Sequence, residues 1–178
     1  MGRGSLSEKK DDIIGGDFWV RRLGLVKHPE GGYYREVYRS KNFLEEKSLP
    51  AGFAGRRSMS TGIYFLLKGG QFSAFHRIRS DEVWHFYAGS PLRLYRINPA
   101  GKLSTVYLGA DPRKRCVFQA AVRAGDWFAA EVSVKAGFSL VGCTTAPGFD
   151  FRDFELAKKE DLSARYPRWK ALIQRLTR

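Results

Sequence analysis

Cysteine is scarce in this chain of 178 residues: only Cys116 and Cys143 occur, and they form no C-x-x-C pair. Zinc fingers and disulfide frameworks depend on clustered cysteines, so the sequence supports neither class. Each cysteine lies in an apolar run, where a thiol usually packs as a small hydrophobic group. Both are therefore expected to be free, buried core residues.

Long apolar runs are also missing. None approaches the roughly 20 residues needed to cross a bilayer, and the opening MGRGSLSEKKDD lacks the apolar core of a signal peptide. We therefore expect a cytoplasmic protein with no membrane partner. Residues 1–10 are expected to form a mobile tail, and residues 11–178 a single domain.

Acidic residues are few beside basic ones, 18 against 31, which leaves a formal charge of +13. Clustered Lys and Arg bind phosphates, so this charge raises the hypothesis of a nucleic-acid partner. The basic residues are spread along the chain, however, and the aromatic residues follow no RNP-type consensus. A solvated basic surface that attracts anionic ligands is favoured, and a nucleic-acid partner is disfavoured.

Short strand-like runs separated by Gly-, Pro- and Asp-rich turns fill most of the chain, which predicts an all-β sandwich or barrel. The runs lie at 33–38, 61–67, 72–79, 83–88, 92–98, 103–108, 116–122, 126–134 and 137–145. Helical spacing predicts a short N-terminal helix from Asp11 or Asp12 and a C-terminal helical cap within 161–176. Residues 39–58 are irregular and predict a long loop that acts as a lid or an arm.

One segment combines glycine, histidine and glutamate at a regular spacing: Gly70, His76, Glu82 and Gly89. This is the spacing of the first cupin motif, G-x5-H-x-H-x3-E-x6-G, with Ile78 in place of the second histidine. Alternate side chains of a strand share a face. If the strands that carry His76 and Glu82 pair as a hairpin, both side chains converge inside a barrel.

Two of the usual cupin metal ligands are replaced by apolar residues. Ile78 is one, and in the later segment 122–131 Phe128 stands at the position of the motif histidine. Catalytic metal sites commonly use three protein ligands. A divalent metal held by His76 and Glu82 with waters is therefore disfavoured, and no cofactor is expected.

Without a metal, His76 and Glu82 could work as a base and an acid or bind a polar ligand. Burial would bring the pKa values of both groups toward neutral pH. A purely structural His–Glu pair is the simpler alternative.

A second group of functional residue types is His28-Pro-Glu-Gly-Gly-Tyr33-Tyr34-Arg35-Glu36. Tyr33 and Arg35 share one strand face and could contact a ligand, although an amphipathic edge strand would look the same. Trp127 could stack on a ring or belong to the core. A slip of one residue would exchange its face with that of Phe128.

Taken together, these segments resemble the uncharacterised cupin-5 family, catalogued as domain of unknown function 985. The resembling stretches are HPEGGYYRE, GIYFLL, residues 76–89, GDWFAA, LVGCTTAPGFDF and DFELA. The resemblance implies a double-stranded β-helix (jelly roll) and commonly a homodimer. It also implies a shape similar to that of metal-free sugar-nucleotide epimerases, which use a His base and a Tyr acid, but no established reaction. Tyr33 or Tyr64 would be the candidate acid here.

The leading hypothesis is a small-molecule pocket inside the barrel that performs epimerase- or isomerase-type proton transfer on a sugar-like or anionic ligand. His76 would take a proton next to a carbonyl group, and Glu82 would orient or polarise the ligand. The expected ligand contacts are Tyr33, Arg35, Tyr64, Trp84, Phe86, Trp127 and Phe128. The alternatives are a non-catalytic binding or sensing module and a metal-dependent enzyme using His76 and Glu82.

Overall fold

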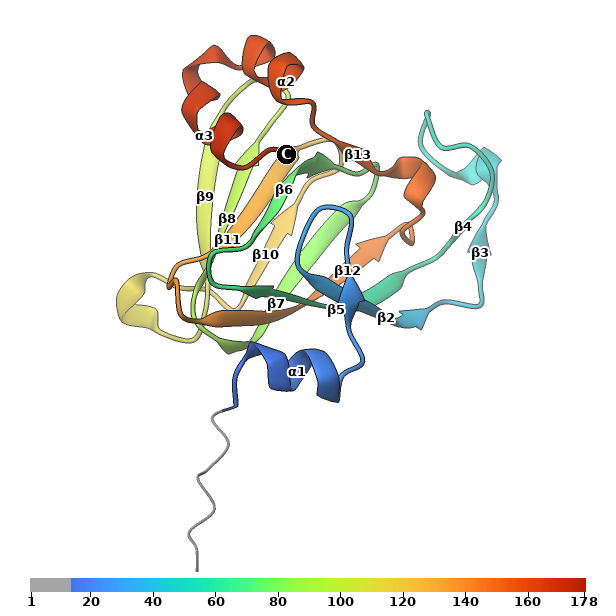
Figure 1. The fold of residues 1–178 in the computed structure, drawn as a ribbon. Coiled ribbons are helices and arrows are strands. Elements are labelled where there is room, and N and C mark those ends of the chain that lie inside the picture. Colours follow the sequence, from blue (N-terminus) through green and yellow to red (C-terminus); the bar gives the residue numbers. More distant parts are fainter. Residues whose placement is uncertain (1–13) are drawn as a thin grey trace, which may run out of the picture.

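The computed structural model describes residues 14–178. The tail expected at residues 1–10 and the start expected for the N-terminal helix lie outside the described residues. Two antiparallel sheets face each other, with one helix beneath them and a group of short helices above (Figure 1).

The first sheet has the strand order β1-β2-β5-β12-β7-β10, and the second β13-β6-β11-β8-β9. The strands of the first sheet, in that order, are Val26–Lys27, Tyr33–Arg39, Thr61–Lys68, Phe138–Ala146, Asp81–Gly89 and Gln119–Val122. Those of the second are Glu155–Leu156, Phe72–Arg77, Trp127–Val132, Leu92–Ile97 and Leu103–Leu108. Each predicted strand-like run contains one of these strands, and the all-β prediction is confirmed.

The strands that carry His76 and Glu82 do not form the expected hairpin. β6 pairs with β11 and β13, whereas β7 pairs with β12 and β10. The prediction was wrong because the short connection between β6 and β7 crosses from one sheet to the other, as chains do at the corners of a sandwich. His76 and Glu82 therefore come from opposite walls of the barrel.

Short helices lie at both ends of the described chain, as expected. Helix α1 (Gly16–Arg22) lies against β5 and β12. At the other end, α2 (Lys159–Arg165), the 3-10 turn η4 (Pro167–Trp169) and α3 (Lys170–Arg175) bury Leu162 and Ile173 against Phe75 and Trp127. The C-terminal helices thus cover the outer face of the second sheet with a hydrophobic cluster that is separate from the core between the sheets.

The side of β6 that faces away from β11 is also covered by the C-terminal part of the chain. The amide of Phe75 donates to the carbonyl of Leu176 at 2.8 Å, and the amide of Ala157 donates to the carbonyl of Phe75 at 2.9 Å. These bonds occupy edge groups of a strand that would otherwise be open to another chain.

The segment predicted as a long loop forms an arm beside the barrel (Figure 1). It contains two short paired strands, β3 (Phe43–Leu44) and β4 (Arg57–Ser58), and the 3-10 turn η1 (Glu46–Ser48). Arg57 Nε donates to Asp153 Oδ2 at 2.7 Å, and both side chains are buried. This ion pair attaches the arm to the 3-10 turn η3 (Phe151–Asp153).

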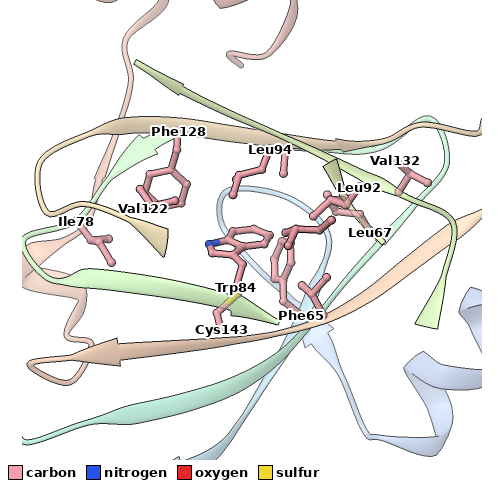
Figure 2. Packing of buried hydrophobic residues seen from close by; sticks show 13 residues of the cluster. Phe65, Leu67, Ile78, Trp84, Leu92, Leu94, Val122, Phe128, Val132 and Cys143 are labelled. Carbon is pink, nitrogen blue, oxygen red and sulfur yellow. The ribbon is translucent and has the colours of Figure 1, made fainter. Parts of the chain in front are cut away.

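The main core fills the space between the sheets around Trp84, with Phe65 and Phe128 packed edge-on against its ring (Figure 2). Cys143 belongs to this core and is free, as predicted. Cys116 is also free but only partly buried, because it follows the turn η2 (Pro112–Lys114) at the surface; its predicted burial was wrong. In the described part of the chain, no helix is long and apolar enough to span a membrane.

Candidate functional site

A cavity of about 370 Å³ opens between the two sheets. Its walls are mostly aromatic and aliphatic, with a small number of polar groups, as is usual for small-molecule sites. The lining residues are His28, Glu30, Tyr34, Glu36, Arg39, Thr61, Ile63, Phe65, His76, Ile78, Glu82, Trp84, Cys143, Thr145, Phe149, Asp150, Phe151 and Phe154.

The turn between β1 and β2 places Glu30 in this cavity, where it is 5% exposed. Gly31 and Gly32 follow it with φ angles of 117° and 70°, which side chains other than glycine rarely adopt. A Cβ atom on Gly31 would lie 2.2 Å from the carbonyl oxygen of Phe72. The two glycines thus let the turn pack directly against β6 and hold Glu30 inside.

Glu30 is the centre of a buried polar cluster. Its Oε2 lies 3.2 Å from His28 Nδ1 and 3.2 Å from His76 Nε2, and Ser73 Oγ donates to its Oε1 at 2.8 Å. Burial opposes ionisation of Glu30, but the charge of His76 and the hydrogen bonds from His28 and Ser73 outweigh it and lower the Glu30 pKa. Glu30 is therefore an ionised carboxylate in the cavity wall.

Both ring nitrogens of His76 are engaged by the protein. Nδ1 lies 2.7 Å from the carbonyl oxygen of Ala74, so this nitrogen carries a proton, and Nε2 faces Glu30. In His28, by contrast, Nδ1 lies 3.2 Å from Glu30 Oε2 and accepts from the Glu30 backbone amide at 3.4 Å, and Nε2 has no hydrogen-bond partner within residues 14–178. His28 Nε2 is therefore the imidazole nitrogen that a ligand in the cavity could reach.

Glu82 lies in the opposite wall and is 8% exposed. Burial, assisted by the negative charge of Glu30, raises the Glu82 pKa to about 8, although the neighbouring Trp84 and Cys143 side chains oppose the increase. At neutral pH the Glu82 carboxyl group is therefore mostly protonated. The cavity thus holds two carboxyl groups in opposite protonation states, an arrangement that assigns acid and base roles.

Three of the predicted site residues line this cavity: His76, Glu82 and Trp84. Phe128 lies directly behind them, with its ring 4.0 Å from that of His76, and Phe86 packs at the edge of the same core. Neither Phe86 nor Phe128 reaches the cavity surface.

The other four predicted ligand contacts lie away from the cavity. Trp127 belongs to the cluster under the C-terminal helices, so Phe128 and not Trp127 faces the barrel interior. Tyr33 and Tyr64 pack near α1, and Arg35 donates to the carbonyl of Leu23 at 2.9 Å. The β2 side chains on the cavity side belong instead to the alternate positions Tyr34 and Glu36.

The segment 28–36 was singled out from the sequence, but Tyr33 and Arg35, and not His28 or Glu30, were expected to meet a ligand. The phenylalanines of the 149–154 segment were not expected at the site. Glu30 reads as an ordinary turn residue because it stands between Pro29 and Gly31. A usable signal was present: a histidine two positions before a glutamate, followed by two glycines that permit close packing.

The two facing sheets and the cavity between them place this chain in the cupin superfamily. The family model described as "Cupin superfamily (DUF985)" matches residues 17–157, and the chain belongs to this family. The jelly-roll fold expected from the sequence is confirmed.

Three relatives that share at least 30% of their residues with this chain carry no assigned activity in their names. A crystal structure of protein SO0799 from Shewanella oneidensis is 41% identical, with a TM-score of 0.83 over 93% of this chain and 99% of that one. A hypothetical protein from Leishmania major is 37% identical, with a TM-score of 0.83 over 92% and 98%. The uncharacterized protein YML079W of Saccharomyces cerevisiae is 30% identical over 77% of this chain and 72% of its own length.

The donor set does not fit the metal site that is common in cupins. Ile78 and Phe128 occupy two of the usual ligand positions as buried core residues, and His76 Nε2 is directed at Glu30. Within residues 14–178, no three His, Cys, Asp or Glu side chains are grouped so as to hold a metal ion.

Proposed function

We propose that this protein catalyses metal-free proton transfer on a small carbonyl compound bound inside the barrel, an isomerase-type reaction. The observation that supports the proposal is the pair of buried carboxyl groups in one cavity, Glu30 ionised and Glu82 protonated. Enolisation requires a base and an acid: the Glu30 carboxylate orients and supports a histidine base, and the protonated Glu82 is the acid.

The reaction begins with proton abstraction by His28. Its Nε2 takes a proton from the carbon next to the carbonyl group, and the electrons of that C–H bond form a carbon–carbon double bond. The carbonyl electron pair moves to oxygen, which receives the proton of Glu82. The proton held by His28 then returns to the former carbonyl carbon, while the hydroxyl group on the neighbouring carbon gives its proton to the Glu82 carboxylate and becomes the new carbonyl group. This completes an aldose–ketose type of isomerisation without any redox partner.

Glu30 supports the base and does not itself react. Its Oε2 lies 3.2 Å from His28 Nδ1. In the reacting tautomer that we propose, the carboxylate accepts the Nδ1 proton, which leaves Nε2 as the base and stabilises the imidazolium that forms. His76, expected from the sequence to be the base, has both ring nitrogens occupied and is proposed to position Glu30.

Deuterium incorporation tests the proposal. The protein is incubated in D₂O with glyceraldehyde, dihydroxyacetone or 2-hydroxyacetophenone, and loss of the C–H signal next to the carbonyl group is followed by proton NMR. We expect catalysed exchange that falls at least tenfold in His28→Gln and Glu30→Gln. His85→Gln is the matched control, because His85 contacts Thr144 at 3.2 Å and lies outside the cavity lining. Exchange at the buffer rate in the wild type, with a bound probe, would contradict the proposal.

Ligand binding without turnover is the second candidate function. It is favoured by the contacts that already occupy the Glu30 carboxylate, from His28, His76 and Ser73. A carboxylate with all its hydrogen-bond partners inside the protein is typical of a structural role. A probe that binds in the cavity but exchanges no deuterium would support this candidate.

A further inference from the structure

The charged side chains at the mouth of the cavity are already paired with one another. Arg39 donates from Nε to Glu36 Oε1 at 2.9 Å and from Nη2 to Glu36 Oε2 at 2.7 Å. Its Nη2 also donates to the carbonyl of Phe149 at 3.1 Å. In the same bidentate manner, Arg152 donates from Nε to Asp150 Oδ1 at 2.9 Å and from Nη2 to Asp150 Oδ2 at 2.7 Å.

No cationic side chain of the lining is therefore left for an anionic ligand. Arg39 is the single Arg or Lys among the lining residues, and the histidines face Glu30. A phosphate or carboxylate buried here would have to break one of these pairs or remain uncompensated, which is costly in an apolar cavity.

The opposite wall offers hydrogen-bond donors. Trp84 is 1% exposed, and its indole N–H lies close enough to the Glu82 carboxyl group to oppose the rise in the Glu82 pKa, although it forms no hydrogen bond of good geometry in the described chain. Trp84 and Glu82 point to the same face of β7, and both line the cavity. Figure 2 shows the indole nitrogen on the ring edge directed toward Ile78, another lining residue. A buried N–H group without a partner is uncommon and indicates a position where a ligand acceptor would be stabilised.

Building on the function proposed above, we propose that the substrate is an uncharged carbonyl compound. Its carbonyl oxygen accepts hydrogen bonds from the Glu82 carboxyl group and from the Trp84 indole N–H. The aromatic side chains at the entrance, Phe149, Phe151 and Phe154, cover an apolar flank of the molecule. The sugar-like ligand expected from the sequence fits this class if it carries no phosphate or carboxylate, and the anionic ligand does not.

The two donors stabilise the negative charge that develops on the substrate during the reaction. As the C–H bond breaks at His28, negative charge develops on the carbonyl oxygen, where donors fixed in a water-poor site stabilise it most. Glu82 then transfers its proton to this oxygen. It takes a proton from the hydroxyl group on the neighbouring carbon when His28 protonates the former carbonyl carbon, so protons and electron pairs balance over one cycle.

Three matched probes test the substrate class. 2-Hydroxyacetophenone carries a ketone, 1-phenyl-1,2-ethanediol replaces the ketone by an alcohol, and mandelate is an anion of similar size. We expect the ketone to bind at least tenfold more tightly than mandelate and more tightly than the diol. We also expect the infrared stretch of its ¹³C-labelled carbonyl to move to lower frequency on binding, because hydrogen bonds weaken the C=O bond. Mandelate binding as tightly as the ketone, or an unchanged stretch in the bound ketone, would overturn the assignment.

Two variants identify the donors. Trp84→Phe should reduce the frequency shift, with circular dichroism to show that the core is intact. Glu82→Gln keeps a neutral donor and should retain the shift at pH 9, where the wild type loses much of it by ionisation of Glu82. The titratable side chains that share the cavity with Glu82 are His28, Glu30, Tyr34, Glu36, Arg39, His76, Cys143 and Asp150. A wild-type shift that is the same at pH 6 and pH 9 would contradict the role of Glu82.

The infrared and deuterium measurements use the same sample and separate the two proposals. A bound ketone with a shifted carbonyl stretch but no deuterium exchange would contradict the isomerase function and leave the substrate class supported. Exchange without a shifted stretch would support proton transfer and overturn the assignment of Glu82 and Trp84.

Discussion

Glu82 has a measurable consequence for stability as well as for chemistry. Its pKa is raised from 4.5 to about 8 in the folded protein, so the folded state holds this proton more tightly than the unfolded state does. Its contribution to stability is therefore fully present below about pH 4.5 and is lost as the pH rises to about 8. The loss is on the order of 4 kcal/mol at 1.36 kcal/mol per pKa unit.

Glu82→Gln should remove this pH dependence. In urea unfolding at pH 5 and pH 9, we expect the wild type to lose on the order of 4 kcal/mol more stability than the variant over this interval. Glu160→Gln, at an exposed position, is the control and should follow the wild type. Parallel losses in the wild type and Glu82→Gln would show that Glu82 is ionised in the folded state.

The residues of the site were only partly predictable. His76 and Glu82 were found because their spacing belongs to a motif that is local in sequence. Glu30 was missed because its significance depends on contacts with His76 and Ser73, more than 40 positions away. The face assigned to Tyr33 and Arg35 was wrong because alternation shows which side chains share a face but not which face is inside.

At the scale of elements, the arm formed by residues 39–58 depends on the buried pair Arg57–Asp153. Arg57→Ala would leave the buried Asp153 carboxylate with only the longer, half-exposed contact to Arg79 at 3.8 Å. Removing one partner of a buried pair usually costs about 3–5 kcal/mol. We expect a loss of about 3 kcal/mol in denaturant unfolding, with faster amide exchange concentrated in the arm.

Arg113→Ala is the matched control for this prediction. Arg113 also pairs with an aspartate, Asp111, but its side chain is 89% exposed. Exposed pairs contribute roughly 0–1 kcal/mol, so little change is expected. Equal effects of Arg57→Ala and Arg113→Ala would mean that the buried pair does not anchor the arm.

The elements themselves were largely predictable, and their pairing was not. Strand runs are marked by alternation and by turn residues, both of which are local signals. The partner of each strand depends on the whole sandwich, so the hairpin expected for β6 and β7 was wrong although both strands were located correctly. The arm was predicted as irregular because its strands β3 and β4 have two residues each.

At the scale of the whole molecule, we expect a homodimer. Several apolar side chains are exposed on β2 and near the arm, including Val37, Tyr38, Phe43 and Met59. Apolar groups along an outer strand favour association with another copy. Sedimentation velocity should give a mass near twice 20.2 kDa, and Tyr38→Glu should shift the protein toward the monomer. A monomeric wild type at micromolar concentration would contradict this expectation.

The covering of the β6 edge also bears on how the protein is synthesised. The strand that carries His76 is bordered by residues 157 and 176, which leave the ribosome long after β6 itself. This side of the cavity wall therefore stays open until residues 157–176 have emerged, and Phe75 and Trp127 stay uncovered until the same helices fold over them. A nascent chain stalled before residue 157 would present this bare strand to chaperones, and binding competence would have to wait for the helices.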